Sequence, residues 1–425
     1  MKKNFLKYIN SKIVKNSFWL SILQIVNTII PMITIPYITR TLGAEQYGNF
    51  SIALNWIVYI QVLVEFGFAL NGARKVAVFE NVKEEIEKLF NNIISSRILL
   101  LVISFILLNI LTIVFNYSEV IYICMLLLFT MIIGVAFQLT WLFQGKQDMR
   151  FITIINLIGR MISVVLTFVF VKSSKDIYLY CFFYALTTII SSIISLIVVY
   201  KKYNLKFKFS KFEDIKNEIS EGKYLFISAA MMKIFSGFGI TVLGFVESSA
   251  KVGIYSAIYK IPYILTLFFS AISQSIYPYV SVEFNKSYNN GIKTVKKLFF
   301  PIFFMFFIMS IIIIFLKDFI IDILFGREYL LYSDIVVPLI IQFLFAIVNN
   351  FVGVQILLAS NKQKIYTKSF TISCICIVIC NVILGKMFGL FGIAYAALIG
   401  EMILCITLLI AMKFFIKRKD VKEND

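Results

Sequence analysis

The sequence of 425 residues contains no histidine, which argues against several classes of function at once. Catalytic triads, histidine proton relays and most zinc sites depend on an imidazole. Acidic residues are also scarce, 23 against 41 basic ones, and they form no cluster that suits a divalent metal. The chain has no P-loop and no glycine-rich phosphate cradle followed by a lysine. We therefore expect no ATP-hydrolysing pump, no cofactor and no metal site.

Cysteine is rare as well, and its positions do not indicate metal binding. Three cysteines lie close together at Cys374, Cys376 and Cys380, which is the only spacing that could suggest a site. All six fall inside apolar stretches, where a thiol is more often a small packing residue than a ligand. The set is Cys124, Cys181, Cys374, Cys376, Cys380 and Cys405.

Apolar residues dominate what remains. The chain is 60% hydrophobic and only 15% charged, with a mean hydropathy of +0.89. A soluble domain could not cover so much apolar surface, so lipid is the expected solvent. The net charge of +18 lies in short loops between apolar runs and forms no compact basic face, so we predict no nucleic-acid partner.

The apolar runs are long enough to cross a bilayer, which takes about 20 residues. We predict an all-α polytopic membrane protein of about 12 transmembrane helices. The predicted spans are 17–38, 47–70, 92–114, 119–143, 151–171, 177–200, 223–246, 254–282, 298–316, 334–358, 369–385 and 391–414. The segment 317–333 is amphipathic and is predicted to lie at the outer surface. With the N-terminus inside, inner segments carry 30 Lys and Arg and outer loops 7, which places both termini in the cytoplasm.

The two halves of the chain resemble one another. Tyr47 to Ser51 (YGNFS) enters the second predicted span, and Val252 to Ser256 (VGIYS) enters the eighth, 205 residues later. Lys146-Gln147 and Lys362-Gln363 give a second, weaker echo. Six spans per half is an even number, so the prediction is two parallel six-helix repeats around a central cavity. The predicted division is an N-terminal lobe at 1–200, a basic cytoplasmic linker at 201–223 and a C-terminal lobe at 224–425.

Four basic residues lie inside predicted spans: Arg97, Arg160, Lys233 and Lys260. A cation in the bilayer costs at least about 2.5–3.5 kcal/mol, so it needs an acidic partner or a wet cavity. The spans offer only Glu65 and Glu401 as acids. We therefore predict a cationic cavity that attracts an anion, while structural ion pairs with these two acids remain the alternative. Arg97, nearer a helix end, could also be a surface anchor.

Amide side chains inside the spans suit sugar hydroxyls, or else hydrogen bonding between helices. On the fifth span, Asn156, Arg160, Ser163 and Thr167 follow one helical face. Asn55 occupies the repeat position of Lys260. The amides predicted to line the cavity are Gln24, Asn27, Asn55, Asn156, Gln274 and Asn349.

Two local motifs carry a family resemblance. The segment from Ile35 to Gly48 (IPYITRTLGAEQYG) resembles the opening signature of the polysaccharide-export branch of the multidrug/oligosaccharidyl-lipid/polysaccharide transporter superfamily. The segment from Val252 to Pro262 (VGIYSAIYKIP), with Gln274 to Ser281 (QSIYPYVS) after it, is similar to the second-half counterpart. Multidrug extruders of this fold usually carry an acid in the first helix, where this chain has Gln24 and Asn27. Lipid II flippases are similar too, but typically have about fourteen spans.

The resemblance implies a Wzx-type flippase for O-antigen or other polysaccharide repeat units, and hence no enzyme. Such a protein moves an undecaprenyl-diphosphate-linked oligosaccharide across the bacterial cytoplasmic membrane by alternating access. Its four intramembrane cations would supply the cationic lumen of the family. Membrane lipids, a polysaccharide polymerase and a chain-length regulator are the partners it implies. Two other functions stay open: a cation-coupled multidrug antiporter, and a scaffold for polysaccharide synthesis enzymes that transports nothing itself.

Overall fold

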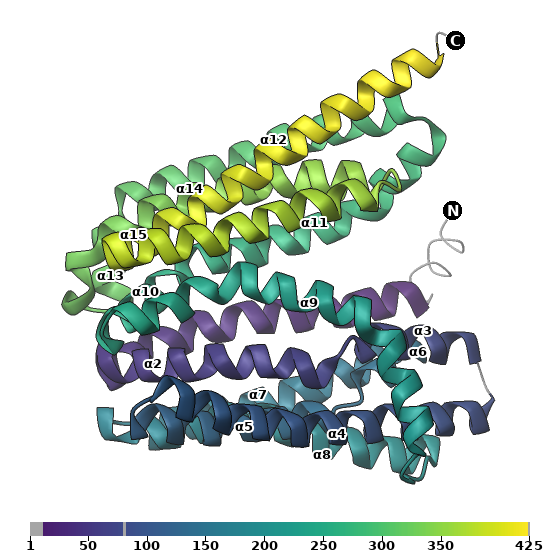
Figure 1. Ribbon diagram of the computed structural model, residues 1–425, viewed down its shortest axis with the longest axis vertical. Coiled ribbons are helices and arrows are strands. Elements are labelled where there is room, and N and C mark those ends of the chain that lie inside the picture. Colours follow the sequence, from purple (N-terminus) through teal and green to yellow (C-terminus); the bar gives the residue numbers. More distant parts are fainter. Residues whose placement is uncertain (1–11, 80–81, 424–425) are drawn as a thin grey trace, which may run out of the picture. The chain divides into compact units, whose positions relative to one another are not determined.

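The computed structural model describes residues 12–79 and 82–423, and every regular element in this part is a helix (Figure 1). The absence of strands there is what lipid demands, because a helix satisfies its own backbone hydrogen bonds. The longer helices are α2 (Lys12–Glu65), α3 (Phe68–Phe79), α4 (Lys83–Phe115), α5 (Glu119–Phe137), α7 (Met149–Phe170), α8 (Ile177–Val198), α9 (Phe212–Val246), α10 (Ser249–Ile258), α11 (Lys260–Lys286), α12 (Tyr288–Phe315), α14 (Val336–Asn350) and α15 (Gln363–Glu423).

Ten helical stretches among the described residues are long and apolar enough to cross a membrane. Two of them are far too long for one crossing, because Phe18–Phe79 has 62 residues and Gln363–Lys413 has 51. Each is broken at a glycine with positive φ: Gly43 (φ 75°) in α2 and Gly389 (φ 54°) in α15. Only glycine adopts that backbone without strain, so the chain reverses there with almost no loop. Counting each as a pair of helices is consistent with the predicted twelve.

The chain divides into two compact units, and the boundary falls inside α9. The first comprises residues 1–34 and 41–233, and the second comprises 35–40 and 234–425. The predicted linker at 201–223 therefore lies within the first of these two units. It contains a stretch without regular structure from Asn204 to Lys211, with a left-handed backbone at Asn204, and the start of α9.

Turn residues stand at equivalent positions of the two halves, although their φ angles differ in sign, 75° at Gly43 and −67° at Ser248. Gly43 and Ser248, which are 205 residues apart, are the turn residues just before the repeated segments. Within those segments Phe50 and Tyr255 are both buried, at 3% and 4% exposed. These features are consistent with the predicted internal repeat.

The second repeated segment has the same turn geometry in both halves, but the turns and the repeated letters Lys-Gln are not at matching positions. At Gln147 and Asn361 the backbone has positive φ, and the next amide bonds back five residues, from Asp148 to Phe143 (2.8 Å) and from Lys362 to Leu357 (2.7 Å). Both are Schellman ends of helices. The equivalent residues are thus 214 apart, whereas the letters Lys-Gln repeat at 216.

Close packing of α7 and α5 onto α8 forms the centre of the first unit. A Cβ added to Gly159 would lie 2.4 Å from the carbonyl oxygen of Thr187, and one added to Gly134 would collide with Thr188. The Thr188 hydroxyl donates to the carbonyl of Met131 at 3.0 Å. Small residues let helix backbones approach in this way when lipid gives no hydrophobic drive between them. The tight α5–α7–α8 core holds the polar residues described next.

Candidate functional site

A string of polar side chains runs through the first unit and includes several of the predicted site residues. Arg160, on α7, donates from Nη1 to Oδ1 of Asn27 on α2 at 2.5 Å. Two turns earlier, the Thr153 hydroxyl donates to the carbonyl of Trp19 at 2.8 Å, which also ties α7 to α2. The guanidinium of Arg160 is half-buried and is held by a neutral amide.

The string continues through Asn156 toward the end of α5. Asn156 donates to its own helix at Ile152 and accepts from Nε2 of Gln138 at 3.1 Å. Its place one turn before Arg160 follows from the helical spacing in the sequence. The next two polar residues of this face do not join the string. The Ser163 hydroxyl donates to the carbonyl of Phe183 on α8, and the Thr167 hydroxyl donates within α7 to the carbonyl of Ser163.

Arg97 has the contacts of a structural cap. Its side chain, on α4, is 2% exposed, and Nη1 donates to the carbonyls of Val135 (3.3 Å), Ala136 (3.4 Å) and Gln138 (2.9 Å). These carbonyls lie in the last turn and C-cap of α5, where the helix dipole has its negative end; that of Val135 also accepts from the amide of Gln138 at 3.2 Å. Arg97 thus offers its charge to backbone, and its part in a cationic cavity stays a prediction.

The other predicted residues of the first unit lie on α2 and α9. Gln24 is half-buried, and its carbonyl accepts from the Thr28 hydroxyl at 2.9 Å. Asn55 is half-buried in the part of α2 that follows Gly43. Lys233 is exposed, and it is the last residue of the first unit on α9.

The second unit contains three predicted residues, which occupy different environments. Lys260 is the first residue of α11 and lies 5.3 Å from the ring centre of Tyr263. Gln274, on the same helix, is exposed and donates to the Ser270 hydroxyl at 2.9 Å. Asn349 is 5% exposed and binds Glu401.

Salt bridges do not explain how three of the predicted intramembrane cations are stabilised. Within the described residues, neither Arg97, Arg160 nor Lys260 takes part in an ion pair. Glu65 accepts instead from Gln61 at 2.8 Å, and Glu401 from Asn349. The two acids proposed as partners are thus hydrogen-bonded to amides, although Glu65 still interacts electrostatically with Arg97, and the cationic cavity stays a prediction.

A partly buried ionic cluster of the first unit was not predicted. Nζ of Lys75, on α3, lies 2.9 and 2.8 Å from the two carboxylate oxygens of Glu218 and 2.8 Å from Glu221, both on α9. Beside it, the Phe66 and Phe226 rings stack at 4.5 Å. The partners are 143 residues apart, so no local pattern could have revealed them. We call these three charged residues the α3–α9 clasp.

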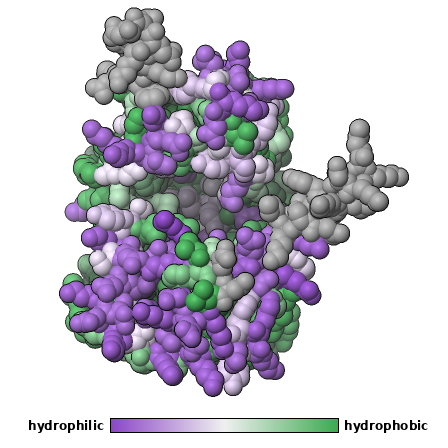
Figure 2. Space-filling view, turned by 90° about the vertical axis from the view of Figure 1, so that its right-hand side faces the viewer, coloured by the Kyte–Doolittle hydropathy of each residue, from purple (hydrophilic) through white to green (hydrophobic). Residues whose placement is uncertain are grey.

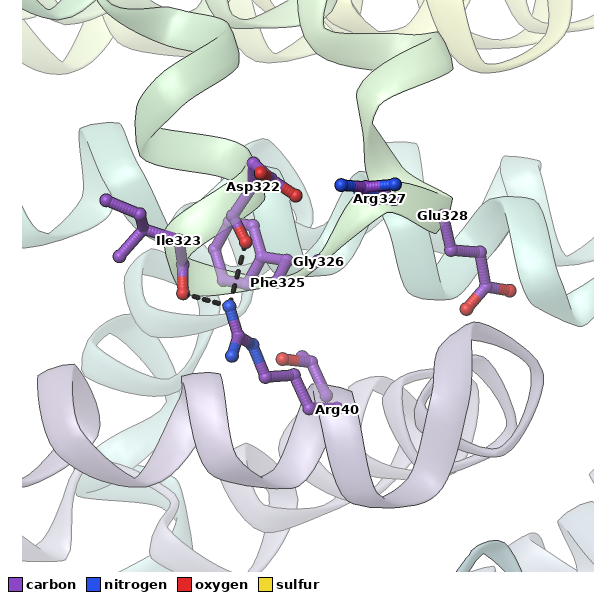
Figure 3. A pocket seen from close by; sticks show the side chains of 8 residues that line it. Arg40, Asp322, Ile323, Phe325, Gly326, Arg327 and Glu328 are labelled. Carbon is purple, nitrogen blue, oxygen red and sulfur yellow. Dashed lines mark hydrogen bonds between the residues drawn. The ribbon is translucent and has the colours of Figure 1, made fainter.

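A polar pocket of about 500 Å³ lies in the second unit, next to α13 (Lys317–Leu324). Figure 3 shows Arg40 reaching the end of this helix, where Nη2 donates to the carbonyls of Asp322 (2.8 Å) and Ile323. Arg327 and Glu328 stand on the opposite wall. The pocket contains both cations and carboxylates, so its charge is balanced.

Residues 317–333 form α13 and the start of a 3-10 helix, η3 (Arg327–Ile335), and α13 is not among the candidate spans. Lys317 binds Asp334 at 2.5 Å and Ser333 at 3.2 Å. The hydrogen bond to Asp334 raises the pKa of Lys317. A hydrogen bond with Ser333 and the neighbouring Lys317 charge lower the pKa of Asp318. This network fixes α13 to η3.

Hydrophilic side chains gather at the end of the first unit where α3 and α6 (Thr140–Gly145) lie (Figure 2). The start of α4 lies at the same end in Figure 1, and its residues Lys83, Glu84 and Glu85 are exposed. Hydrophobic side chains appear at the edges of the same view. Such a polar end suits a surface that faces water beyond the lipid.

The chain is similar to proteins named for glycan transport. A protein of Escherichia coli (strain K12) named as an O-antigen transporter is 28% identical over 361 residues, which cover 83% of this chain and 85% of that protein. A Haloferax volcanii protein named as a low-salt glycan biosynthesis flippase is 24% identical over 388 residues, covering 90% and 79%. These names describe transporters and flippases, in agreement with the prediction that the chain is not an enzyme.

Two solved structures share the fold at low sequence identity. The lipid II flippase MurJ, in an inward closed conformation, has a TM-score of 0.76 at 17% identity and covers 92% of this chain and 87% of that one. An inward-facing multidrug transporter of the MATE family has a TM-score of 0.68 at 12% identity and covers 92% and 99%. Both are likenesses of fold.

Residues 13–284 match the family described as polysaccharide biosynthesis protein. The match includes both motifs on which the resemblance was based, and it spans more than half of the chain. The resemblance to the polysaccharide-transporter branch is therefore confirmed, and the chain belongs to the polysaccharide biosynthesis protein family.

Proposed function

We propose that this protein is a flippase that moves an undecaprenyl-diphosphate-linked oligosaccharide from the inner to the outer leaflet of a bacterial cytoplasmic membrane. Both termini would lie in the cytoplasm. The names of its relatives in Escherichia coli and Haloferax volcanii support a lipid-linked glycan as substrate. The MurJ-like fold supports movement by alternating access.

The observation that carries the proposal is the setting of Arg160. This guanidinium lies on an apolar helix and is held by the neutral side chain of Asn27, with no ion pair among the described residues. An intramembrane cation that no carboxylate neutralises attracts an anion, and the attraction is stronger where the dielectric is low. A diphosphate is an anion of the required kind.

The amides around Arg160 suit the rest of the substrate. Asn27, Asn156 and Gln138 are linked to one another or to Arg160 by hydrogen bonds. Amides both donate and accept, as sugar hydroxyls do. In this proposal the acyl chain stays in lipid while the diphosphate and the first sugars meet these groups. A polysaccharide polymerase and a chain-length regulator would act on the product at the outer leaflet.

The experiment follows the leaflet position of lipid-linked oligosaccharide in cells depleted of the protein. We expect the substrate to accumulate facing the cytoplasm and the wild-type gene to restore outer exposure. Loss of a charged hydrogen-bond partner is worth roughly 1.5–3 kcal/mol, so Arg160→Gln should lower the flipping rate about tenfold or more. Arg160→Lys should retain part of it. Combining Arg160→Gln with Lys233→Gln tests the second predicted cation of this unit.

Arg150 provides the matched control. It lies on the same helix but is exposed, with its guanidinium 5.8 Å from the ring centre of Trp19. Arg150→Gln should flip at the wild-type rate. If depletion leaves outer exposure unchanged, the protein is no flippase of this substrate, and drug efflux becomes the next assay. If depletion blocks exposure but both Arg160→Gln and the double variant restore it, a scaffold role is favoured.

A further inference from the structure

The second unit holds a buried carboxyl group that the proposed substrate path does not use. Glu401 lies on α15 and is 8% exposed. Nδ2 of Asn349, on α14, donates to its Oε2 at 2.7 Å and to its backbone carbonyl at 2.9 Å. Gln342, two turns earlier on α14, brings a second amide to the same carboxyl. Two positions of one helix, two turns apart, thus present amides to a single acid.

No cation balances a charge on this group in the part of the chain that the structure describes. None of its ion pairs includes Glu401. The titratable groups that face it are Tyr259, between α10 and α11, and Tyr366 and Cys405, both on α15. From α14 it meets only amides. An ionised carboxylate with neutral neighbours of this kind is poorly compensated in a membrane protein.

The amide partner has a hydrogen-bonding capacity that remains unfilled. Oδ1 of Asn349 is buried and has no donor. A buried acceptor without a donor is unfavourable and needs an explanation. A proton on the carboxyl of Glu401 would be such a donor, because a carboxylic acid and an amide can each donate once and accept once. The side chain of Asn349 already makes one half of that exchange.

We propose that Glu401, Asn349 and Gln342 form a proton-binding site inside the second unit, and that one transport cycle requires this carboxyl to take up and release a proton. The proton comes from water on one side of the membrane and returns to water, and no other bond is made or broken. The transport part of this proposal rests on the proposed function, but the proton site does not.

The proton site is tested without transport, by infrared spectroscopy of the full chain in vesicles of phosphatidylethanolamine and phosphatidylglycerol. We expect a band of a protonated, hydrogen-bonded carboxyl that shifts in D₂O, titrates with pH and is lost in Glu401→Gln. Asn349→Leu should move its frequency. The matched control is Glu247→Gln, which removes a half-buried glutamate of the same unit that is paired with Lys251 at 2.7 Å. An unchanged spectrum in Glu401→Gln would overturn the site.

The coupling is tested in the same vesicles, loaded with lipid-linked oligosaccharide. An imposed pH gradient should accelerate flipping by the wild type and by Glu247→Gln, and Glu401→Gln should lose that response. If flipping follows a sodium gradient and ignores the pH gradient, the proton proposal is wrong. If wild type flips and Glu401→Gln responds to pH as wild type does, the coupling is wrong while the proposed function stands. If wild type does not flip, the proposed function fails and the infrared result alone decides the proton site.

Discussion

The α3–α9 clasp allows a quantitative test of how the first unit is held together. Lys75 contacts both oxygens of Glu218 and one oxygen of Glu221. The exposed side-chain fractions differ: 4% for Glu218, 22% for Lys75 and 54% for Glu221. Replacing Lys75 with Met therefore leaves one buried carboxylate without its cation, whereas replacing Glu221 with Gln removes only a surface partner.

The expected losses of stability differ severalfold. Breaking a buried ion pair by removing one partner costs about 3–5 kcal/mol, and the partial exposure of Lys75 places this case near the lower end. Removing an exposed partner costs about 0–1 kcal/mol. For a domain of this size each kcal/mol lowers the thermal midpoint by about 2–4 °C. We expect Lys75→Met to lower the midpoint by about 6–12 °C and Glu221→Gln by less than about 4 °C.

A thiol-reactive dye measures the midpoint, because Cys124 and Cys181 are fully buried and become reactive on unfolding. Unfolding of a membrane protein is often irreversible, so all variants are heated at one rate. The double variant Lys75→Met/Glu218→Met removes both charges and should recover much of the loss. The reasoning is refuted if Lys75→Met is no less stable than Glu221→Gln, or if the double variant is as unstable as Lys75→Met.

Three further predictions concern other parts of the fold. Arg97→Gln should lower stability by about 2–3 kcal/mol, seen as a lower thermal midpoint, because three carbonyls lose a charged donor; an unchanged midpoint with reduced flipping would favour the cavity role. Gly159→Ala should cost about 1–3 kcal/mol by forcing α7 from α8, and Gly43→Ala, whose added Cβ meets no atom within 4 Å, should cost a similar amount through backbone strain alone, both seen as lower thermal midpoints. The pKa of Asp318 is lower in the folded protein than in the unfolded chain. Its ionised carboxylate therefore stabilises the fold at pH values above the ordinary pKa of about 3.9, and this stabilisation is lost as pH falls through the pKa of the folded state. Hydrogen exchange in α13, corrected for intrinsic rates, should therefore rise only below about pH 4, and a rise between pH 5 and 8 would contradict this.

The fold was largely predictable because lipid imposes a simple rule on the sequence. Runs of about 20 apolar residues must be helices, and this rule found the helical stretches that the structure contains. The reversal at Gly43 was placed only as a gap between two spans, since hydropathy does not register backbone dihedral angles. The second echo, at Lys146-Gln147, was two residues out of register because the turn geometry is repeated and the letters are not.

The site was predictable only in its local part. Asn156 and Arg160 are one turn apart, so helical periodicity placed them together. Asn27, Gln138 and the carbonyls that bind Arg97 come from other helices, and no spacing in the sequence encodes which helices meet. For the same reason the sequence did not place Asn349 beside Glu401, to which it donates in the structure, and its part in lining a cavity stays a prediction.

The glycine reversals at Gly43 and Gly389 decide where a reporter can be attached. A single residue joins the two helices at each reversal, so a peptide tag inserted there would separate helix ends that depend on direct contact. The stretch from Asn204 to Lys211 is different, because it belongs to no helix and Lys206, Phe207 and Lys208 are exposed. A fluorophore or epitope at 206–208 should therefore be tolerated and would allow the protein to be counted and imaged while it works.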